Sequence, residues 1–387
     1  MPAHHTLIET YGQRSERPGL TPLATYLLQL MHFKRTNLCL SADVSTTAEL
    51  LQLAEEVGDQ ICILKTHADI IKDFTDRTAS RLAEIARRRQ FVIFEDRKLG
   101  DIGNTVQQQY IGGTLSIVRW AHIVNAHLFP GPSIIDALAE GAKKAIAAYN
   151  TSVQTNISAS PALSLDGAAD DRSVSSRGFD SEEHEAASED EESSGIEEET
   201  EEERLGRKNS VVSVSTTIST KTEAISPQPS FRPSLSRGAS GDSDVEEEEV
   251  DLEELGPPPF YRSLLLLAQM SSKDNFFTPQ YTAACVKHAR ANRDFVIGFI
   301  AQESLNVERE DNFITMTPGV QLAAGSDAMG QQYNTPHKVI GEAGSDVIIV
   351  GRGILSAIDK RRAAHEYRKQ GWAAYEARIK AGRKRSR

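Results

Sequence analysis

The chain has 387 residues, of which 39% are hydrophobic, and a formal net charge of −12. The charge is unevenly placed: residues 161–255 hold 27 acidic and 8 basic residues, and the other 292 residues hold 28 acidic and 35 basic ones. Outside 161–255 the chain is therefore mildly basic, which excludes an acidic-protein interpretation of that part and suits an anionic small molecule. The length permits two ordinary domains or one large α/β barrel with extra material.

The cysteines Cys39, Cys62 and Cys285 lie far apart in the sequence. This spacing offers neither a disulfide framework nor a zinc site, and it favours a reducing, cytoplasmic location. The N-terminus lacks the apolar stretch of a secretory signal, and no run reaches the length of a membrane span. We expect neither a membrane nor a nucleic acid as partner.

Short apolar runs alternate with amphipathic patterns along most of the chain. The expected strands cover residues 38–43, 61–65, 91–95, 117–124, 264–270, 295–301, 313–317 and 347–350. Helical patterns separate several of them, at 46–57, 76–89, 133–149 and 279–291. Eight strands in this alternation predict a (β/α)8 TIM barrel. An open doubly wound sheet is the alternative, but no Gly-x-Gly-x-x-Gly follows the first strand.

A Ser- and Glu-rich stretch interrupts the alternation. Residues 152–257 have almost no aromatic side chains and cannot bury enough apolar surface to offset their chain entropy, which predicts a disordered acidic insertion. The barrel then comprises residues 1–151 and 258–375, and residues 376–387 form a basic tail. An alternative treats the chain as an interaction protein whose acidic arm, with serines beside acids, is phosphorylated.

Charged residues gather where the first three expected strands end, which is the catalytic face of such a barrel. Asp96 and Lys98 leave the third strand on the same face, because strand side chains alternate. Asp101 follows in a glycine-flanked turn, and Lys65 and Asp43 end the second and first strands. A lysine between carboxylates stays protonated, so Lys98 is a positioned acid. The alternative is a set of structural ion pairs.

Two features near the end of the chain suit a phosphate group. Gly351 and Arg352 follow the eighth strand, where barrels commonly bind phosphate, although a mere turn is the alternative. After the seventh strand, residues 325–333 show neither a helix nor a strand pattern, which predicts a lid with Gln331 and Tyr333 as polar tips. The alternative for this stretch is an ordinary surface loop.

Together these segments resemble orotidine 5'-phosphate decarboxylases, above all the single-function fungal type. The resemblance is carried by residues 94–98 (Phe-Glu-Asp-Arg-Lys) with 101–105 (Asp-Ile-Gly-Asn-Thr), and by the segments 40–43, 64–67, 267–273, 316–320, 330–333 and 350–353. It covers roughly residues 5–150 and 258–375, and it implies a TIM barrel that converts orotidine 5'-phosphate to UMP with no cofactor and no metal.

The resemblance also implies roles for individual residues. Lys98 matches the lysine that protonates C6 of the pyrimidine, and Asp96 matches the carboxylate that faces the substrate carboxylate. Asp101 and Thr105 match residues that reach the partner's ribose across a homodimer interface. The remaining matches are Asp43 and Lys65 for the ribose and charged network, Ser271, Pro318 and Gln331 for the pyrimidine, and Gln331, Tyr333, Gly351 and Arg352 for the phosphate.

Two points stand beside the resemblance. Asp274 occupies a position where a glycine is usual in the family, in the loop after the fifth strand. The nearest rival is a 3-keto-gulonate 6-phosphate decarboxylase, which shares the Asp-x-Lys-x-x-Asp pattern but uses magnesium; residues 101–105 and the loop with Gln331 and Tyr333 speak against it.

Overall fold

Eight parallel strands close into a barrel in the order β1-β12-β9-β8-β7-β4-β3-β2. The computed structural model describes residues 3–160, 211–220, 255–323, 325–326 and 332–385. The barrel strands are β1 (Leu38–Ser41), β2 (Ile63–Thr66), β3 (Val92–Leu99), β4 (Ile123–Ala126), β7 (Ser263–Leu267), β8 (Val296–Ile300), β9 (Ile314–Thr317) and β12 (Val347–Val350). The predicted TIM barrel is confirmed.

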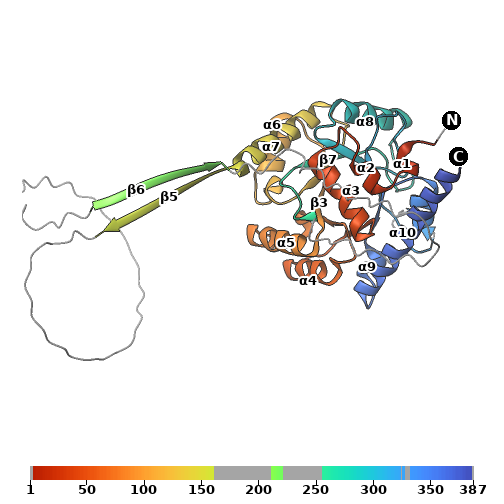
Figure 1. Ribbon diagram of the computed structural model, residues 1–387, viewed down its shortest axis with the longest axis horizontal. Coiled ribbons are helices and arrows are strands. Elements are labelled where there is room, and N and C mark those ends of the chain that lie inside the picture. The colour runs from red at the N-terminus through yellow and green to blue at the C-terminus, as the bar shows by residue number, and fades with distance from the viewer. Residues whose placement is uncertain (1–2, 161–210, 221–254, 324, 327–331, 386–387) are drawn as a thin grey trace, which may run out of the picture. The chain divides into compact units, whose positions relative to one another are not determined.

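Helices between the strands cover the outside of the barrel (Figure 1). They are α4 (Thr47–Val57), α5 (Asp76–Arg89), α6 (Gly103–Ile111), α7 (Ser133–Asn150), α8 (Pro279–Ala291), the π-helical η5 (His337–Glu342) and α9 (Arg352–Leu355). The sequence sets several helix starts: Thr46 and Thr75 form capping boxes at α4 and α5, and Thr278 caps α8 ahead of Pro279. Because the strands are covered on both faces, they appear in the sequence as continuous apolar runs.

Helices from the two ends of the chain pack against each other. They are α1 (His5–Ile8), α2 (Tyr11–Ser15), α3 (Pro22–Lys34) and α10 (Lys360–Arg385). The ring of Tyr11 stacks on that of Tyr375 at 4.1 Å, and its backbone N–H donates to the Tyr375 hydroxyl. The helix α10 continues to Arg385 with Ile379 buried, which corrects the expected basic tail at 376–387 as far as residue 385.

The end of the barrel where the strands begin is closed by buried polar contacts. The ammonium of Lys34, at the end of α3, donates to the carbonyls of Gly58, Ile61, Arg89 and Gln90, at the loops that enter β2 and β3. A buried lysine ammonium needs acceptors, and these four carbonyls supply them. This face serves stability, as is general for TIM barrels.

The fourth strand differs from its expected range 117–124. Residues Ile117–Arg119 form the 3-10 turn η2, and the strand covers Ile123–Ala126. The buried guanidinium of Arg262 donates to the carbonyls of Val118 and Arg119. This contact occupies carbonyls that a longer strand would use for pairing. An apolar run in the sequence does not reveal such a tertiary contact.

The acidic stretch contains one described element, an antiparallel ribbon of β5 (Thr151–Ser160) and β6 (Val211–Thr220). The expected insertion at 152–257 includes all of these twenty residues except Thr151, and the ribbon is regular structure that the sequence did not predict. Both strands are rich in Val, Ile, Thr and Ser, of which the β-branched residues favour strands. Residues 161–210 and 221–254 lie outside the described part of the chain. No described helix is long and apolar enough to cross a bilayer.

Candidate active site

Charged side chains from β1, β2 and β3 converge at the carboxyl end of the barrel. Lys65 Nζ lies 2.9 Å from Asp96 Oδ2 and 3.9 Å from Asp43 Oδ1. Lys98 Nζ lies 2.7 Å from the other carboxylate oxygen of Asp96. Two ammonium groups and two carboxylates thus alternate in one cluster, so that each charge has an opposite neighbour. The expected association of Asp43, Lys65, Asp96 and Lys98 is present.

The cluster is graded from buried to exposed. The Lys65 and Asp96 side chains are 7% and 11% exposed, whereas those of Lys98 and Asp43 are 36% and 45% exposed. Burial alone would raise the pKa of Asp96, but Lys65, Lys98 and His67 hold this pKa well below its usual range. Asp96 is therefore a fixed negative charge that orients two lysines, with Lys98 at the accessible edge.

His67 joins this cluster, although it was not among the expected site residues. Its Nε2 lies 2.8 Å from Lys65 Nζ, 3.5 Å from Asp96 Oδ2 and 3.7 Å from Asp43 Oδ1. Burial and then the Lys65 ammonium lower the pKa of His67. The neutral ring is thereby favoured, and its Nε2 accepts a hydrogen bond from Lys65. The sequence does place His67 two residues after Lys65, a spacing at which strand side chains share one face.

The backbone that presents Lys98 is irregular. Lys98 has φ +51°, and the β3–β4 register shifts between Glu95 and Leu99. Asn125 of β4 lies opposite this bulge; its Oδ1 accepts from the Lys98 backbone N–H over 2.7 Å, and its Nδ2 donates to Asp96 Oδ1 over 2.7 Å. Asn125 was not among the expected site residues; its position within the apolar run of β4 is the feature of the sequence that could have indicated it.

Glu95 faces away from the cluster, as the strand alternation predicts. Its buried carboxylate accepts from the Thr66 hydroxyl over 2.6 Å and from the Ala68 backbone N–H over 3.0 Å. Burial raises the pKa of Glu95 to about 7, and the two donors oppose this rise. Glu95 thus ties the end of β2, where Lys65 lies, to β3.

Asp101 and Thr105 lie apart from the charged cluster within the chain. The Asp101 carboxylate accepts from the Ile102 backbone N–H over 2.9 Å and from Gln109 Nε2 over 3.4 Å. Thr105 is exposed on α6. Among the described residues, neither side chain forms a hydrogen bond or an ion pair with the cluster.

A second group of residues surrounds the expected phosphate position. The guanidinium of Arg352 lies over the Tyr333 ring, 5.5 Å from its centre. Gly351 lies against β1, since a Cβ there would approach Asp43 Oδ2 and Ser41 Cβ, each to 3.3 Å. Glycine is needed at position 353 for packing instead, because a Cβ there would overlap the Tyr367 hydroxyl. Only the first glycine of the Gly-Arg-Gly motif therefore borders the charged cluster.

The loop after β9 is held at its base. Asn334 donates its backbone N–H to the Gly319 carbonyl over 2.9 Å, and Gln321 donates to the Asn334 carbonyl over 3.0 Å. The described parts of the loop pair as β10 (Gly325–Ser326) and β11 (Gln332–Tyr333), where the sequence predicted no strand. The Gln332 backbone N–H also donates to the Ser271 carbonyl over 3.4 Å, so the loop contacts the segment after β7. Gln331 lies outside the described residues; Pro318 follows β9 directly.

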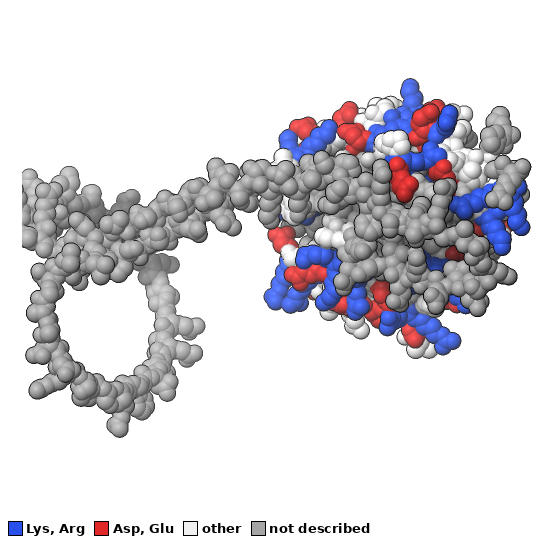
Figure 2. All heavy atoms as spheres, viewed as in Figure 1, with Lys and Arg blue, Asp and Glu red and all other residues white. Residues whose placement is uncertain are grey.

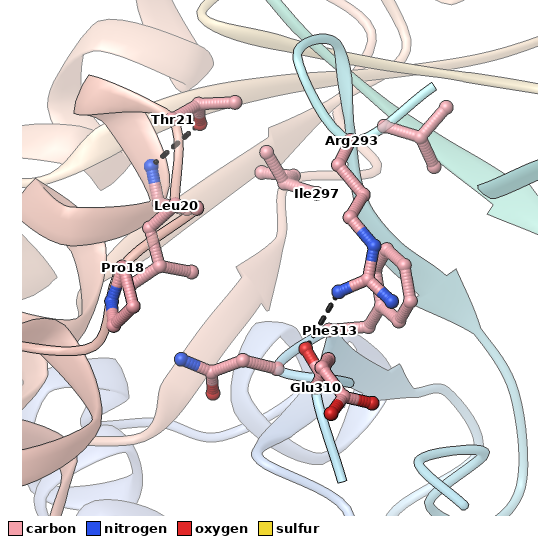
Figure 3. Close-up of a pocket in the computed structure, with 11 residues that line it drawn as sticks. Pro18, Leu20, Thr21, Arg293, Ile297, Glu310 and Phe313 are labelled. Carbon is pink, nitrogen blue, oxygen red and sulfur yellow. Dashed lines mark hydrogen bonds between the residues drawn. The ribbon is translucent and has the colours of Figure 1, made fainter. Parts of the chain in front are cut away.

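A pocket lies at the opposite end of the barrel, where β8 and β9 begin (Figure 3). Arg293 lies there over the Phe313 ring and donates to the Glu310 carbonyl over 2.6 Å. Pro18, Leu20 and other mostly apolar or neutral side chains complete the lining. The pocket has no group of ionisable side chains comparable to the cluster at Asp96, and its end of the barrel is the stability face.

Charges of both signs are mixed over the visible barrel surface, and basic side chains gather on the side of α10 (Figure 2). Within the described part of the chain, no group of three or more His, Cys, Asp or Glu side chains is arranged to hold a metal ion. The described cysteines are all free and buried.

The chain is similar to known proteins over nearly its whole length. The model of the "Orotidine 5'-phosphate decarboxylase / HUMPS family" matches residues 36–367. A relative from Aureobasidium pullulans, named orotidine 5'-phosphate decarboxylase, is 42% identical over 97% of this chain and 96% of its own. One of the same name from Hypocrea jecorina is 44% identical over 98% of this chain and 100% of its own. A Bos taurus uridine 5'-monophosphate synthase is 35% identical over 96% of this chain but only 53% of its own.

Proposed function

The chain belongs to the orotidine 5'-phosphate decarboxylase / HUMPS family, as a carbon–carbon lyase, and we propose that it converts orotidine 5'-phosphate to UMP without a cofactor. The observation that carries the proposal is the alternation of Asp43, Lys65, Asp96 and Lys98 over 2.7 to 3.9 Å at the catalytic face. In this role the enzyme supplies the last step of de novo pyrimidine nucleotide synthesis.

The proposed chemistry breaks one carbon–carbon bond and forms one carbon–hydrogen bond. Carbon dioxide leaves from C6 of the pyrimidine, and the bonding electron pair stays on that carbon. The Lys98 ammonium stabilises the developing negative charge and then gives its proton to C6. Lys98 afterwards regains a proton from solvent, which is favoured by the adjacent Asp96 carboxylate.

Asp96 has two parts in the proposal. It fixes the Lys98 ammonium by the 2.7 Å contact, so that little reorganisation is needed when charge develops. Its own negative charge, held by Lys65 on the other side, lies near the substrate carboxylate and repels it until carbon dioxide departs. Lys65 and Asp43 bind the ribose hydroxyls at the edge of the same cluster.

The phosphate and the pyrimidine of the substrate bind to residues beside the charged cluster. Arg352 offers a planar, permanently charged fork to the phosphate, with Gly351 allowing close approach and Tyr333 beside it. The family resemblance assigns Gln331 to both the phosphate and the pyrimidine, and it assigns Ser271 and Pro318 to the pyrimidine. The contact between Gln332 and Ser271 supports a coupling of the two binding regions, through which the loop at 319–333 closes and excludes water.

The proposed functional unit is a homodimer in which Asp101 and Thr105 complete the partner's site at the ribose. The exposed apolar side chain next to Asp101 supports this arrangement: Ile102 is 52% exposed. We further propose a reducing, cytoplasmic location, in keeping with three free cysteines.

The first experiment follows the loss of orotidine 5'-phosphate absorbance and the appearance of UMP with the purified full chain, with and without EDTA. We expect rapid conversion that EDTA does not change. Folded protein that converts no substrate would overturn the proposed activity. Conversion that EDTA abolishes would instead indicate the metal-assisted chemistry of the rival decarboxylase.

Mixing two inactive variants tests the shared site. Lys98→Ala and Asp101→Ala each remove a residue that every site needs, but a mixed dimer combines one intact Lys98 with one intact Asp101 in a single site. Unfolding and refolding the two variants together should restore roughly a quarter of the wild-type activity, because about half of the dimers are mixed and each has one intact site of two. Refolding each variant alone is the control, and no recovery on mixing would contradict a shared site.

A further inference from the structure

Asn125 is a polar residue within an otherwise apolar, buried strand. The strand β4 reads Ile-Val-Asn-Ala, and the side chain of Asn125 is fully buried. A buried amide lowers stability unless it is hydrogen-bonded, so its partners indicate why this residue type stands there. Both partners of Asn125 belong to the charged cluster of β3.

The first partner is the backbone of Lys98. Between the pairs Glu95–Val124 and Leu99–Ala126, β3 advances four residues while β4 advances two, so the regular ladder is interrupted. Lys98 takes the left-handed φ of +51° in this bulge. Its N–H donates to Asn125 Oδ1 over 2.7 Å, and the side chain thus replaces a lost ladder contact.

The second partner is the carboxylate of Asp96. Asn125 Nδ2 donates to Asp96 Oδ1 over 2.7 Å, and this same oxygen accepts from Lys98 Nζ over 2.7 Å. The N–H of Lys98 requires an acceptor and the ionised Asp96 requires a donor, so the amide can lie in one orientation only. One rigid side chain therefore fixes both the backbone that carries Lys98 and the carboxylate that holds its ammonium.

We propose that Asn125 is a positioning residue for the decarboxylation: it holds Asp96 and Lys98 in their mutual geometry without itself contacting the reacting carbon. This inference rests on the function proposed above. Removing the amide would release both ends of the bulge, and misplacement of a reacting group by about 1 Å can lower a rate by about a hundredfold. The effect should fall on kcat, because the side-chain hydrogen bonds of Asn125 to described residues go to Lys98 and Asp96 and not to the residues assigned to the phosphate.

The test compares Asn125→Leu with Asn37→Leu in the full chain. Asn37 is equally buried, but it lies at the opposite end of the barrel and donates to the Gly371 carbonyl. We expect Asn125→Leu to lower kcat by about a hundredfold with KM changed by less than about threefold. Asn37→Leu should lower the melting temperature and leave kcat unchanged at a temperature where it is folded.

A second variant keeps the test decisive if Asn125→Leu does not fold. In Asn125→Asp, a protonated carboxyl can donate to Asp96 as the amide does, whereas an ionised one cannot. The charged or titratable groups around this position are Asp96 and Lys98 of β3, Lys65 and His67 of the β2 end beyond Asp96, and His127 just after β4; β7 on the other side brings none. The kcat of Asn125→Asp, relative to wild type, should therefore fall as pH rises.

The outcomes separate the two proposals. If the wild-type chain converts no orotidine 5'-phosphate, the proposed function fails. If the wild type is active and Asn125→Leu keeps its kcat within about twofold, the positioning role is wrong. For Asn125→Asp, a kcat equal to that of the wild type at every pH would also overturn it.

Discussion

The ammonium of Lys98 and the carboxylate of Asp96 lie 2.7 Å apart, although the backbone of Lys98 near the end of β3 has a left-handed conformation. A lysine rarely adopts this conformation, and surrounding contacts must compensate for the strain. The strain is localised at the residue to which we assign proton delivery. It is compensated by Asn125 and by the ion pair itself.

We expect Lys98→Ala to lower kcat by about a thousandfold or more, because the positive charge beside the developing carbanion is lost. The fold should remain, since the side chain is 36% exposed. Steady-state turnover and circular dichroism measure the two properties. Lys143→Ala is the matched control, because Lys143 is an exposed lysine on α7 that pairs with Asp294. Full-rate turnover by Lys98→Ala would contradict the assignment.

For Arg352→Ala we expect a weaker substrate complex: KM should rise by about ten- to a hundredfold, the effect of losing a charged hydrogen bond. kcat should change less, because the guanidinium is assigned to the phosphate and not to C6. Arg361→Ala, at an exposed arginine of α10 that pairs with Asp59, provides the comparison. A rise in KM of equal size in both variants would argue against a phosphate site at Arg352.

Deleting residues 155–255 should leave kcat and KM nearly unchanged. The deleted stretch begins after the end of α7 and ends before the start of β7. Both of these points lie at the end of the barrel where the strands begin, which is opposite the charged cluster. The deletion is compared with the full chain in the same assay. A large fall in kcat for a folded deletion variant would show that the segment acts on the site.

Glu95 should make stability depend on pH. Burial raises its pKa from 4.5 to about 7, so its contribution to stability is fully present below about pH 4.5 and is lost as pH rises through about 7. The loss is at most about 3 kcal/mol. Urea unfolding between pH 4.5 and 8 should therefore give a flatter curve for Glu95→Gln than for wild type. Glu342→Gln, at an exposed glutamate, should follow the wild-type curve.

Asp274 has φ +55° in the loop after β7, where the family resemblance leads one to expect glycine. Glycine takes this conformation without strain, so Asp274→Gly should raise the free energy of unfolding by about 0.5 kcal/mol. Asp274→Ala should lower it by about 1 kcal/mol, because alanine lacks the side-chain oxygen that helps aspartate tolerate a positive φ. Thermal or urea unfolding measures both, and equal stabilities would refute the strain argument.

The sequence by itself determined the barrel and most of its site. Apolar runs in regular alternation with capped helices specify parallel strands, and the rule that chemistry lies at strand ends pointed to Asp43, Lys65, Asp96 and Lys98. Side-chain alternation was sufficient to place Asp96 and Lys98 together and Glu95 on the other face. These features depend on the local periodicity of residue types, which can be read directly from one amino-acid sequence.

Only the tertiary structure decided the contacts between strands. The bulge in β3, the left-handed Lys98 and the amide of Asn125 depend on the register of β3 against β4, which no local pattern encodes. The 3-10 turn at Ile117–Arg119 likewise depends on Arg262, more than 140 residues away. Residues distant in sequence meet only when the barrel closes, and their hydrogen bonds then fix the backbone geometry on which the site depends.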